Sequence, residues 1–245
     1  MTRRALPAGY ERVRVGRAEA VTVRDLVPLM PEVLADGTLY DFARRQVGAA
    51  EFAGRLPAYA IPMPAGDGKM VVRHNRHGGL LAALTGDRFV YPTRAPRELE
   101  ISTRLADAGV ATPVLLGYAV YRSGVFARSD VATRLVEPSR DLSAVLAGGD
   151  AKARARGLDL TATLVAQLAR AGARHHDFNA KNVLVADRAL VLDVDRVTFG
   201  WAPDVALAHN LARLDRSLHK RRASFGEAIT DEEIASLGAA AAARL

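Results

Sequence analysis

The chain has 245 residues, of which 49% are hydrophobic and 25% charged, a balance typical of a globular protein with a sizeable core. It has no Cys, which excludes disulfides and thiolate metal sites, and its apolar runs are too short for a membrane span or a secretory signal, so we expect a cytoplasmic protein. Lys and Arg outnumber Asp and Glu by 34 to 27, and only four of these cations are Lys. The Arg excess indicates either a coding bias or the binding of phosphates and carboxylates, for which guanidinium groups are well suited.

The N-terminal third predicts a β-rich region. Alternating Val residues at 13–15 and 21–23 indicate two short strands, and the residues over 36–46 favour a helix. Two apolar runs at 59–63 and 70–72 flank the sequence Ala-Gly-Asp-Gly, which is typical of a hairpin because Gly permits positive φ.

A helix and two strands follow. Apolar residues at helical spacing predict a helix over 97–108, and Gly109 is placed to end it. The segments 113–120 and 124–136 are typical of strands, and Glu137 precedes a Pro where a linker between two lobes is expected.

The C-terminal part is predominantly helical. Leu residues three or four apart predict a core helix over 158–172, and further helices are expected at about 204–219 and after Thr230. Between them, 175–197 predicts a polar loop, a short strand, a turn at 186–188, a second short strand and an acidic loop.

That polar block contains a set of residues suited to phosphoryl transfer. Asp177 precedes Asn182 by five residues, Asp193 lies eleven residues further on, and His175 or His176 is placed to support the loop. One carboxylate orients the attacking hydroxyl, while an amide oxygen and a second carboxylate hold magnesium. The alternative interpretation is that the Asp and Asn residues are ordinary loop residues that bond to nearby backbone.

Several segments together resemble the 3-deoxy-D-manno-octulosonic acid (Kdo) kinase family, in the lipopolysaccharide core kinase superfamily. The segments HHDFNAKNVLV and LDVDRV resemble the catalytic and metal loops of that family. The segment RAPRELEISTRLADAGVATP resembles its Glu-bearing helix. The segments VVRHNRHGGLLAALTGDRFVY (71–91) and NLARLDRSLHK (210–220) also resemble that family. The similarity covers about residues 54–220.

The resemblance implies a two-lobed α+β fold like that of protein kinases. We expect a β-rich, nucleotide-binding N-terminal lobe over 1–137, with an irregular N-terminal extension, and a mainly helical C-terminal lobe over 138–245 that carries the catalytic and metal loops. The implied reaction is transfer of the ATP γ-phosphoryl group, with Mg²⁺, to a hydroxyl of Kdo on a lipid A precursor.

The resemblance also implies roles for individual residues. Asp177 is expected as catalytic base, Asn182 and Asp193 as magnesium ligands, and Glu98 as the helix carboxylate that pairs with a cation on the third strand. That cation is Arg73 rather than the usual Lys, and no G-x-G-x-x-G loop precedes it. Arg can bind phosphate oxygens through two parallel hydrogen bonds, although a solvated strand residue is the simpler alternative.

A second departure is Asn179, which stands where many protein kinases have Lys, although the Kdo kinase pattern has the same Asn. Lys181 is either a phosphate contact or an exposed loop cation. Arg76, Arg88 and Arg196 are candidate contacts of an anionic acceptor, and each has the alternative of a solvated surface residue.

The expected partners are ATP, an anionic glycolipid and the cytoplasmic face of the inner membrane, with no nucleic acid. Two alternatives remain open: a kinase of another acceptor, such as a core heptose or an aminoglycoside-like molecule, and a non-catalytic lipopolysaccharide-binding protein. The presence of the base and both metal ligands favours an enzyme.

Overall fold

A computed structural model describes residues 5–52, 57–64, 66–75, 89–148, 150–225 and 229–245. The chain divides into two compact units, the first formed by Met1–Glu100 and Val114–Leu135, the second by Ile101–Pro113 and Val136–Leu245. The nucleotide-binding role expected for 1–137 and the catalytic role expected for 138–245 stay predictions.

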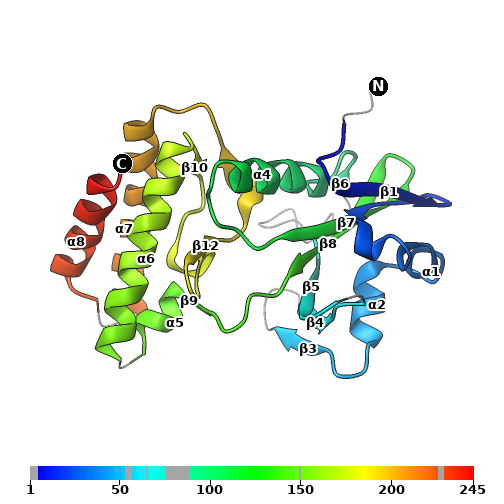
Figure 1. Cartoon of the computed structure of the whole chain (residues 1–245), viewed down its shortest axis with the longest axis horizontal. Coiled ribbons are helices and arrows are strands. Elements are labelled where there is room, and N and C mark those ends of the chain that lie inside the picture. Colours follow the sequence, from blue (N-terminus) through cyan, green and yellow to red (C-terminus); the bar gives the residue numbers. More distant parts are fainter. Residues whose placement is uncertain (1–4, 53–56, 65, 76–88, 149, 226–228) are drawn as a thin grey trace. The chain divides into compact units, whose positions relative to one another are not determined.

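The first unit is built on one antiparallel sheet (Figure 1). Its strand order is β1-β2-β7-β8-β5-β4-β3, with β6 paired to β8. The strands are β1 (Tyr10–Val15), β2 (Ala18–Val23), β3 (Ala50–Phe52), β4 (Ala58–Pro62), β5 (Lys69–His74), β6 (Phe89–Val90), β7 (Leu115–Ser123) and β8 (Phe126–Arg134). The predicted hairpin at 59–72 corresponds to β4-β5, and the strands predicted at 13–15, 21–23, 113–120 and 124–136 correspond to β1, β2, β7 and β8.

Short helices cover one face of this sheet. They are η1 (Arg24–Leu26), α1 (Met30–Ala35) and α2 (Leu39–Arg45). A longer helix, α4 (Ala95–Asp107), comes after β6 in the chain. The Oγ of Thr38 accepts a hydrogen bond from the N–H of Asp41 and so caps α2, which shortens the helix expected over 36–46. We did not predict α1 because its six residues are too short for a clear helical period.

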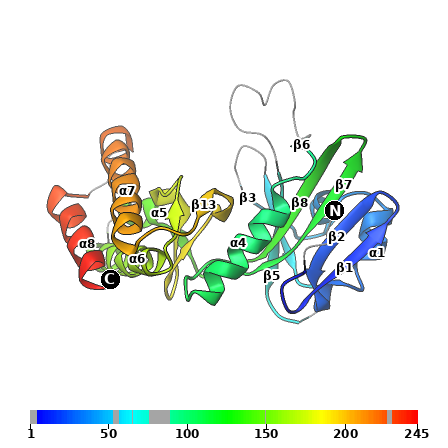
Figure 2. The ribbon, with the colours of Figure 1, turned by 90° about the horizontal axis from the view of Figure 1, so that it is seen from above.

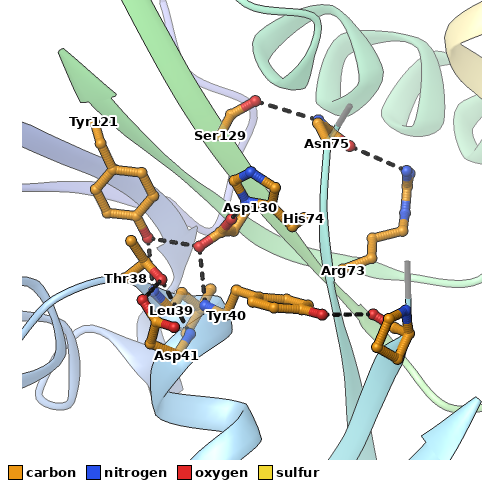
Figure 3. Close-up of polar contacts among 11 residues, drawn as sticks. Thr38, Leu39, Tyr40, Asp41, Arg73, His74, Asn75, Tyr121, Ser129 and Asp130 are labelled. Atoms are coloured by element: carbon orange, nitrogen blue, oxygen red, sulfur yellow. Dashed lines mark hydrogen bonds and ion pairs between the residues drawn. The ribbon is translucent and has the colours of Figure 1, made fainter. Parts of the chain in front are cut away.

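A buried carboxylate joins α2 to the sheet (Figure 3). Asp130 of β8 is fully buried, and its Oδ2 accepts hydrogen bonds of 2.9 Å from the N–H of Tyr40 and from the hydroxyl of Tyr121. Its Oδ1 lies 2.5 Å from Nδ1 of His74 on the neighbouring strand. Because every oxygen of this carboxylate has a partner, its burial is compatible with a stable fold.

The second unit is mainly helical, and α6 packs against both α7 and α8 (Figure 1 and Figure 2). Its helices are α5 (Leu142–Leu146), α6 (Ala151–Arg170), α7 (Pro203–Phe225) and α8 (Asp231–Ala243). Its strands and 3₁₀ turns are β9 (Arg140–Asp141), β10 (Arg174–His175), η2 (Ala180–Asn182), β11 (Val183–Val185), β12 (Ala189–Val191), η3 (Val194–Arg196) and β13 (Val197–Thr198).

Helix α6 begins seven residues before the start predicted for it. Asp150 caps it by accepting hydrogen bonds from the N–H groups of Lys152 and Ala153. Gly157 sits inside the helix because a Cβ there would lie 3.0 Å from a methyl group of Val145 in α5. A glycine that disfavours a helix locally is thus explained by the close approach of two helices.

The predicted α+β class is confirmed: one antiparallel sheet dominates the first unit and helices dominate the second. Among the described residues, no helix combines the length and apolarity needed to cross a membrane.

Candidate functional site

His175 anchors the candidate catalytic loop from inside the second unit. Its side chain is fully buried, its Nε2 lies 2.9 Å from the carbonyl oxygen of Leu192, and its Nδ1 accepts a 3.1 Å hydrogen bond from the N–H of Asp177. Burial lowers the pKa of His175, which keeps the ring neutral with its proton on Nε2. The buried ring of Phe178, 5.7 Å from the imidazole, holds the following turn in the core.

The loop itself is fixed by amide side chains around an exposed carboxylate. The Nδ2 groups of Asn179 and Asn182 both donate to the carbonyl oxygen of Asp177, at 3.0 and 2.8 Å. The Oδ1 of Asn179 accepts from the N–H of Lys181 and thereby caps η2. The carboxylate of Asp177 is about half exposed, at 51%, so an external hydroxyl can reach it while its backbone stays fixed.

The β11-β12 hairpin brings the backbones of Asn182 and Asp193 together. Its register pairs Val183 with Val191, and the N–H of Leu192 donates to the carbonyl oxygen of Asn182. Asp193 follows directly and adopts a left-handed backbone conformation with φ of 59°. A non-glycine residue held there costs conformational free energy, which is typical of positions that aim a side chain at a functional site.

The donor chemistry of these two residues fits Mg²⁺. Among the described residues, neither Oδ1 of Asn182 nor the carboxylate of Asp193 accepts a hydrogen bond, so both remain as oxygen ligands. The same part of the chain holds no group of three or more His, Cys, Asp or Glu side chains around a common point. A set of one amide and one carboxylate suits a magnesium ion that takes its other ligands from water and nucleotide phosphates.

Helix α7 contacts this loop at three successive turns. The fully buried Asn210 accepts from the N–H of His175 and donates to the carbonyl oxygen of Ala173, both at 2.9 Å. Ser217 accepts a 3.1 Å hydrogen bond from the N–H of Ala180, and Nη2 of Arg213 lies 3.4 Å from Oδ1 of Asp177. Sequence reasoning gave these three residues no role. The sequence signals were the family resemblance of the segment 210–220 and the spacing of three and four residues within NLARLDRS.

In the first unit, a second polar group surrounds Arg73. Its guanidinium forms an ion pair with Glu98 of α4, whose side chain is nearly fully buried. Its Nη1 also donates to Oδ1 of Asn75 at 3.2 Å, and Asn75 in turn donates to Oγ of Ser129 at 3.3 Å (Figure 3). Arg73 lies near the end of β5, and Asn75 follows directly after the last residue of that strand. Asn75 and Ser129 were not predicted from the sequence.

Four further candidates are Lys181, Arg196, Arg76 and Arg88, of which the structure describes the first two. Lys181 and Arg196 are exposed residues of η2 and η3 in the second unit. Arg76 and Arg88 lie outside the described residues. Their acceptor-binding or nucleotide-binding roles stay predictions.

Comparison with known proteins gives a consistent family. A family model described as lipopolysaccharide kinase (Kdo/WaaP) family matches residues 59–240. A protein of Vibrio vulnificus named 3-deoxy-D-manno-octulosonic acid kinase is 27% identical over 78% of this chain and 81% of its own length. A protein of the same name from Stenotrophomonas maltophilia is 30% identical over 69% of this chain and 68% of its own.

A solved structure described as WaaP in complex with acyl carrier protein is similar in fold, with a TM-score of 0.53 and 19% identity over 87% of this chain and 86% of that one. The predicted two-lobed protein-kinase-like fold is thereby confirmed. Because the family model covers most of the chain, the sequence, fold and loop geometry lead to one conclusion: this chain belongs to the Kdo/WaaP lipopolysaccharide kinase family and is an ATP-dependent phosphotransferase.

Proposed function

We propose that this kinase of lipopolysaccharide core biosynthesis transfers the γ-phosphoryl group of ATP to a hydroxyl of Kdo on a lipid A precursor. The observation that carries the proposal is the loop around Asp177, where an exposed carboxylate is mounted on a backbone fixed by His175, Asn179 and Asn182. The names of the Vibrio and Stenotrophomonas relatives support Kdo as the acceptor sugar.

In the proposed reaction, Asp177 orients the acceptor hydroxyl and takes its proton. A bond forms between the acceptor oxygen and the γ-phosphorus, and the bond from that phosphorus to the β,γ-bridging oxygen breaks, so that ADP leaves. The neutral His175 keeps the backbone of Asp177 in place because its Nδ1 accepts the N–H of that residue. A positioned general base contributes roughly 10²- to 10⁴-fold to the rate.

We assign Asn182 and Asp193 to Mg²⁺. A bound magnesium ion neutralises negative charge on the nucleotide phosphates. The hairpin between the two residues holds their backbones close together in space. The left-handed conformation of Asp193 sets the direction in which its side chain leaves the backbone.

We assign Arg73 to the nucleotide phosphates, with Glu98 and Asn75 holding its guanidinium in position. A guanidinium offers several N–H groups in one plane, so it can keep these partners and still bind phosphate oxygens. Lys181 is proposed as a further phosphate contact, because the cap by Asn179 fixes its backbone in η2.

The acceptor is proposed to be an anionic glycolipid at the cytoplasmic face of the inner membrane. The net charge of +7 favours such a surface electrostatically. Arg76, Arg88 and Arg196 are the proposed contacts to the carboxylate and phosphates of the acceptor.

Substitution of the base tests this assignment. Asp177→Asn should lower turnover about 10²- to 10⁴-fold without loss of folding, because the side chain is half exposed and the backbone contacts of the loop remain. The measurement is magnesium-dependent phosphate transfer from ATP to a Kdo-bearing lipid A precursor. Asp187→Asn, in the exposed turn of the same hairpin, is the matched control and should keep wild-type turnover. Near wild-type transfer by Asp177→Asn would overturn the role of Asp177.

A further inference from the structure

We propose that Arg213 of α7 is a catalytic residue whose guanidinium binds the phosphoryl group during its transfer. The proposal rests on the proposed function, since it takes Asp177 as the base. Its starting point is the 3.4 Å contact between Nη2 of Arg213 and Oδ1 of Asp177, the one ion pair of that carboxylate within the described part of the chain.

The distance places Arg213 close to the reacting atoms. An acceptor hydroxyl bound to a catalytic carboxylate lies about 2.6–3.2 Å from it, and the attacked atom lies about 3–3.5 Å beyond that hydroxyl. A cation that already touches the carboxylate is therefore within reach of oxygens on the transferred phosphoryl group. The side chain of Arg213 is 35% exposed, so a ligand can approach it.

Between Asp177 and Asn182 the catalytic loop has one cation, Lys181, which is proposed above as a phosphate contact. Asn179, two residues after the base, is neutral, and both ends of its amide are used within the loop, on Asp177 and on the N–H of Lys181. The guanidinium of Arg174 stacks 4.1 Å from the centre of the Trp201 ring and also contacts His209, so its role is structural. The cation that contacts the base thus comes from α7, and its charge adds to that of Lys181.

The backbone of Arg213 is held in place by the contacts of its neighbours on α7. One turn earlier, Asn210 is bonded to the backbone of the loop, and one turn later Ser217 is bonded to η2. Leu214 and Leu218 on the same helix are buried in the core of the second unit. A preorganised cation stabilises developing charge without a cost of reorganisation, which is the condition for electrostatic catalysis.

In the free protein, one amino group of Arg213 pairs with Asp177. During transfer, the remaining N–H groups of the guanidinium are available for the equatorial oxygens of the phosphoryl group, which carry the charge of the transition state. The proton of the acceptor still passes to Asp177, and Arg213 keeps its own charge throughout. Its contribution is to the transition state and not to the binding of ATP.

Kinetics and a transition-state mimic test the proposal together. For the wild type, Arg213→Gln and Arg213→Lys, we would measure kcat and KM for ATP with a Kdo-bearing lipid A precursor. We would also measure the affinity for ADP with magnesium, with and without aluminium fluoride, which mimics the phosphoryl group in transfer. Arg216→Gln is the matched control, since Arg216 is an exposed Arg three residues further along α7.

Arg213→Gln should lower kcat about 10²- to 10³-fold and change the KM for ATP less than about threefold. Its affinity for ADP should be unchanged, while the gain in affinity on adding aluminium fluoride should fall by a factor similar to that in kcat. Arg213→Lys should recover part of both losses, because it restores the charge without the planar fork. Arg216→Gln should match the wild type.

Two results would overturn the proposal. If Arg213→Gln lowered kcat but kept the full aluminium fluoride effect, the role of Arg213 would be only to position the loop. If Arg213→Gln raised the KM for ATP and left kcat unchanged, the role of Arg213 would be only to bind ATP. Failure of the proposed function gives a different pattern, in which Asp177→Asn retains wild-type transfer. The unfolding midpoint of each variant, measured in urea, separates these outcomes from loss of folding, and Arg213→Lys carries the test if Arg213→Gln does not fold.

Discussion

Arg73 takes its position from residues that are distant in the sequence. Glu98 comes from α4, and Asn75 is itself held by Ser129 of β8, 54 positions further along the chain. A guanidinium with fixed partners loses less conformational freedom when it binds phosphate than a freely rotating one. The affinity for the nucleotide should therefore depend on Asn75, a residue that need not touch it.

Asn75→Ala tests this dependence. The loss of one hydrogen bond to the guanidinium, about 0.5–1.5 kcal/mol, should raise the KM for ATP about 2- to 13-fold and leave kcat nearly unchanged. Asn75→Asp keeps an acceptor for Nη1 and should stay near the wild-type KM. Arg73→Ala should raise KM more than Asn75→Ala. Equal KM values for the wild type and Asn75→Ala would show that Asn75 does not orient Arg73.

The buried His175 makes stability depend on pH. Burial lowers its pKa below the usual 6.5, outweighing the hydrogen bond to Leu192 and the nearby carboxylates, so the unfolded chain binds a proton more readily than the folded one. The contribution of the neutral ring to stability is therefore complete above pH 6.5 and is progressively lost as the pH falls below it.

We expect the free energy of unfolding, measured in urea, to decline from pH 7.5 to 5.5. His175→Gln has no titrating ring, so its stability should be lower at pH 7.5 but should decline less steeply. The same slope for both proteins would show that His175 does not titrate differently in the folded and unfolded states.

At the scale of elements, α7 determines the geometry of the catalytic loop. The buried amide of Asn210 accepts a hydrogen bond from the N–H of His175 and donates one to the carbonyl oxygen of Ala173. A buried backbone group left without a hydrogen bond costs about 1–3 kcal/mol. The helix thus couples the stability of the second unit to the position of the loop.

Asn210→Ala should lower the free energy of unfolding by about 2–4 kcal/mol, because both backbone groups lose their partner. Chemical denaturation in urea measures this loss. Arg216→Ala, at an exposed position of α7, should change stability by less than about 0.5 kcal/mol. If Asn210→Ala were as stable as Arg216→Ala, the hydrogen bonds of Asn210 would not contribute to the free energy of unfolding.

The elements also show what local sequence can and cannot predict. The hairpins, α4 and the loop with Asp177, Asn182 and Asp193 follow from spacing and turn residues, since their signals lie within one segment. The early start of α6 was missed because Gly157 disfavours a helix locally and is explained only by α5. Asn75 could not be predicted either, because its partner Ser129 belongs to another strand.

At the scale of the whole molecule, the two units carry separable parts of the proposed chemistry. Arg73 and Glu98 belong to the first unit, whereas Asp177, Asn182 and Asp193 belong to the second. Variants of the first pair are expected to change the KM for ATP, and variants of the second group to change turnover. Membership of the lipopolysaccharide kinase (Kdo/WaaP) family does not by itself specify the acceptor sugar, so the acceptor needs its own test.

The most direct measurement of the central claim is therefore phosphate transfer from ATP by the purified full chain to a Kdo-bearing lipid A precursor. The same assay would offer a heptosylated core and an aminoglycoside as competing acceptors, and Asp177→Asn as the inactive control. We predict magnesium-dependent transfer to the Kdo acceptor, with kcat/KM at least about 100-fold above the others, a difference of about 2.7 kcal/mol. Equal or faster transfer to the heptosylated core or the aminoglycoside, or transfer that Asp177→Asn retains, would contradict the account.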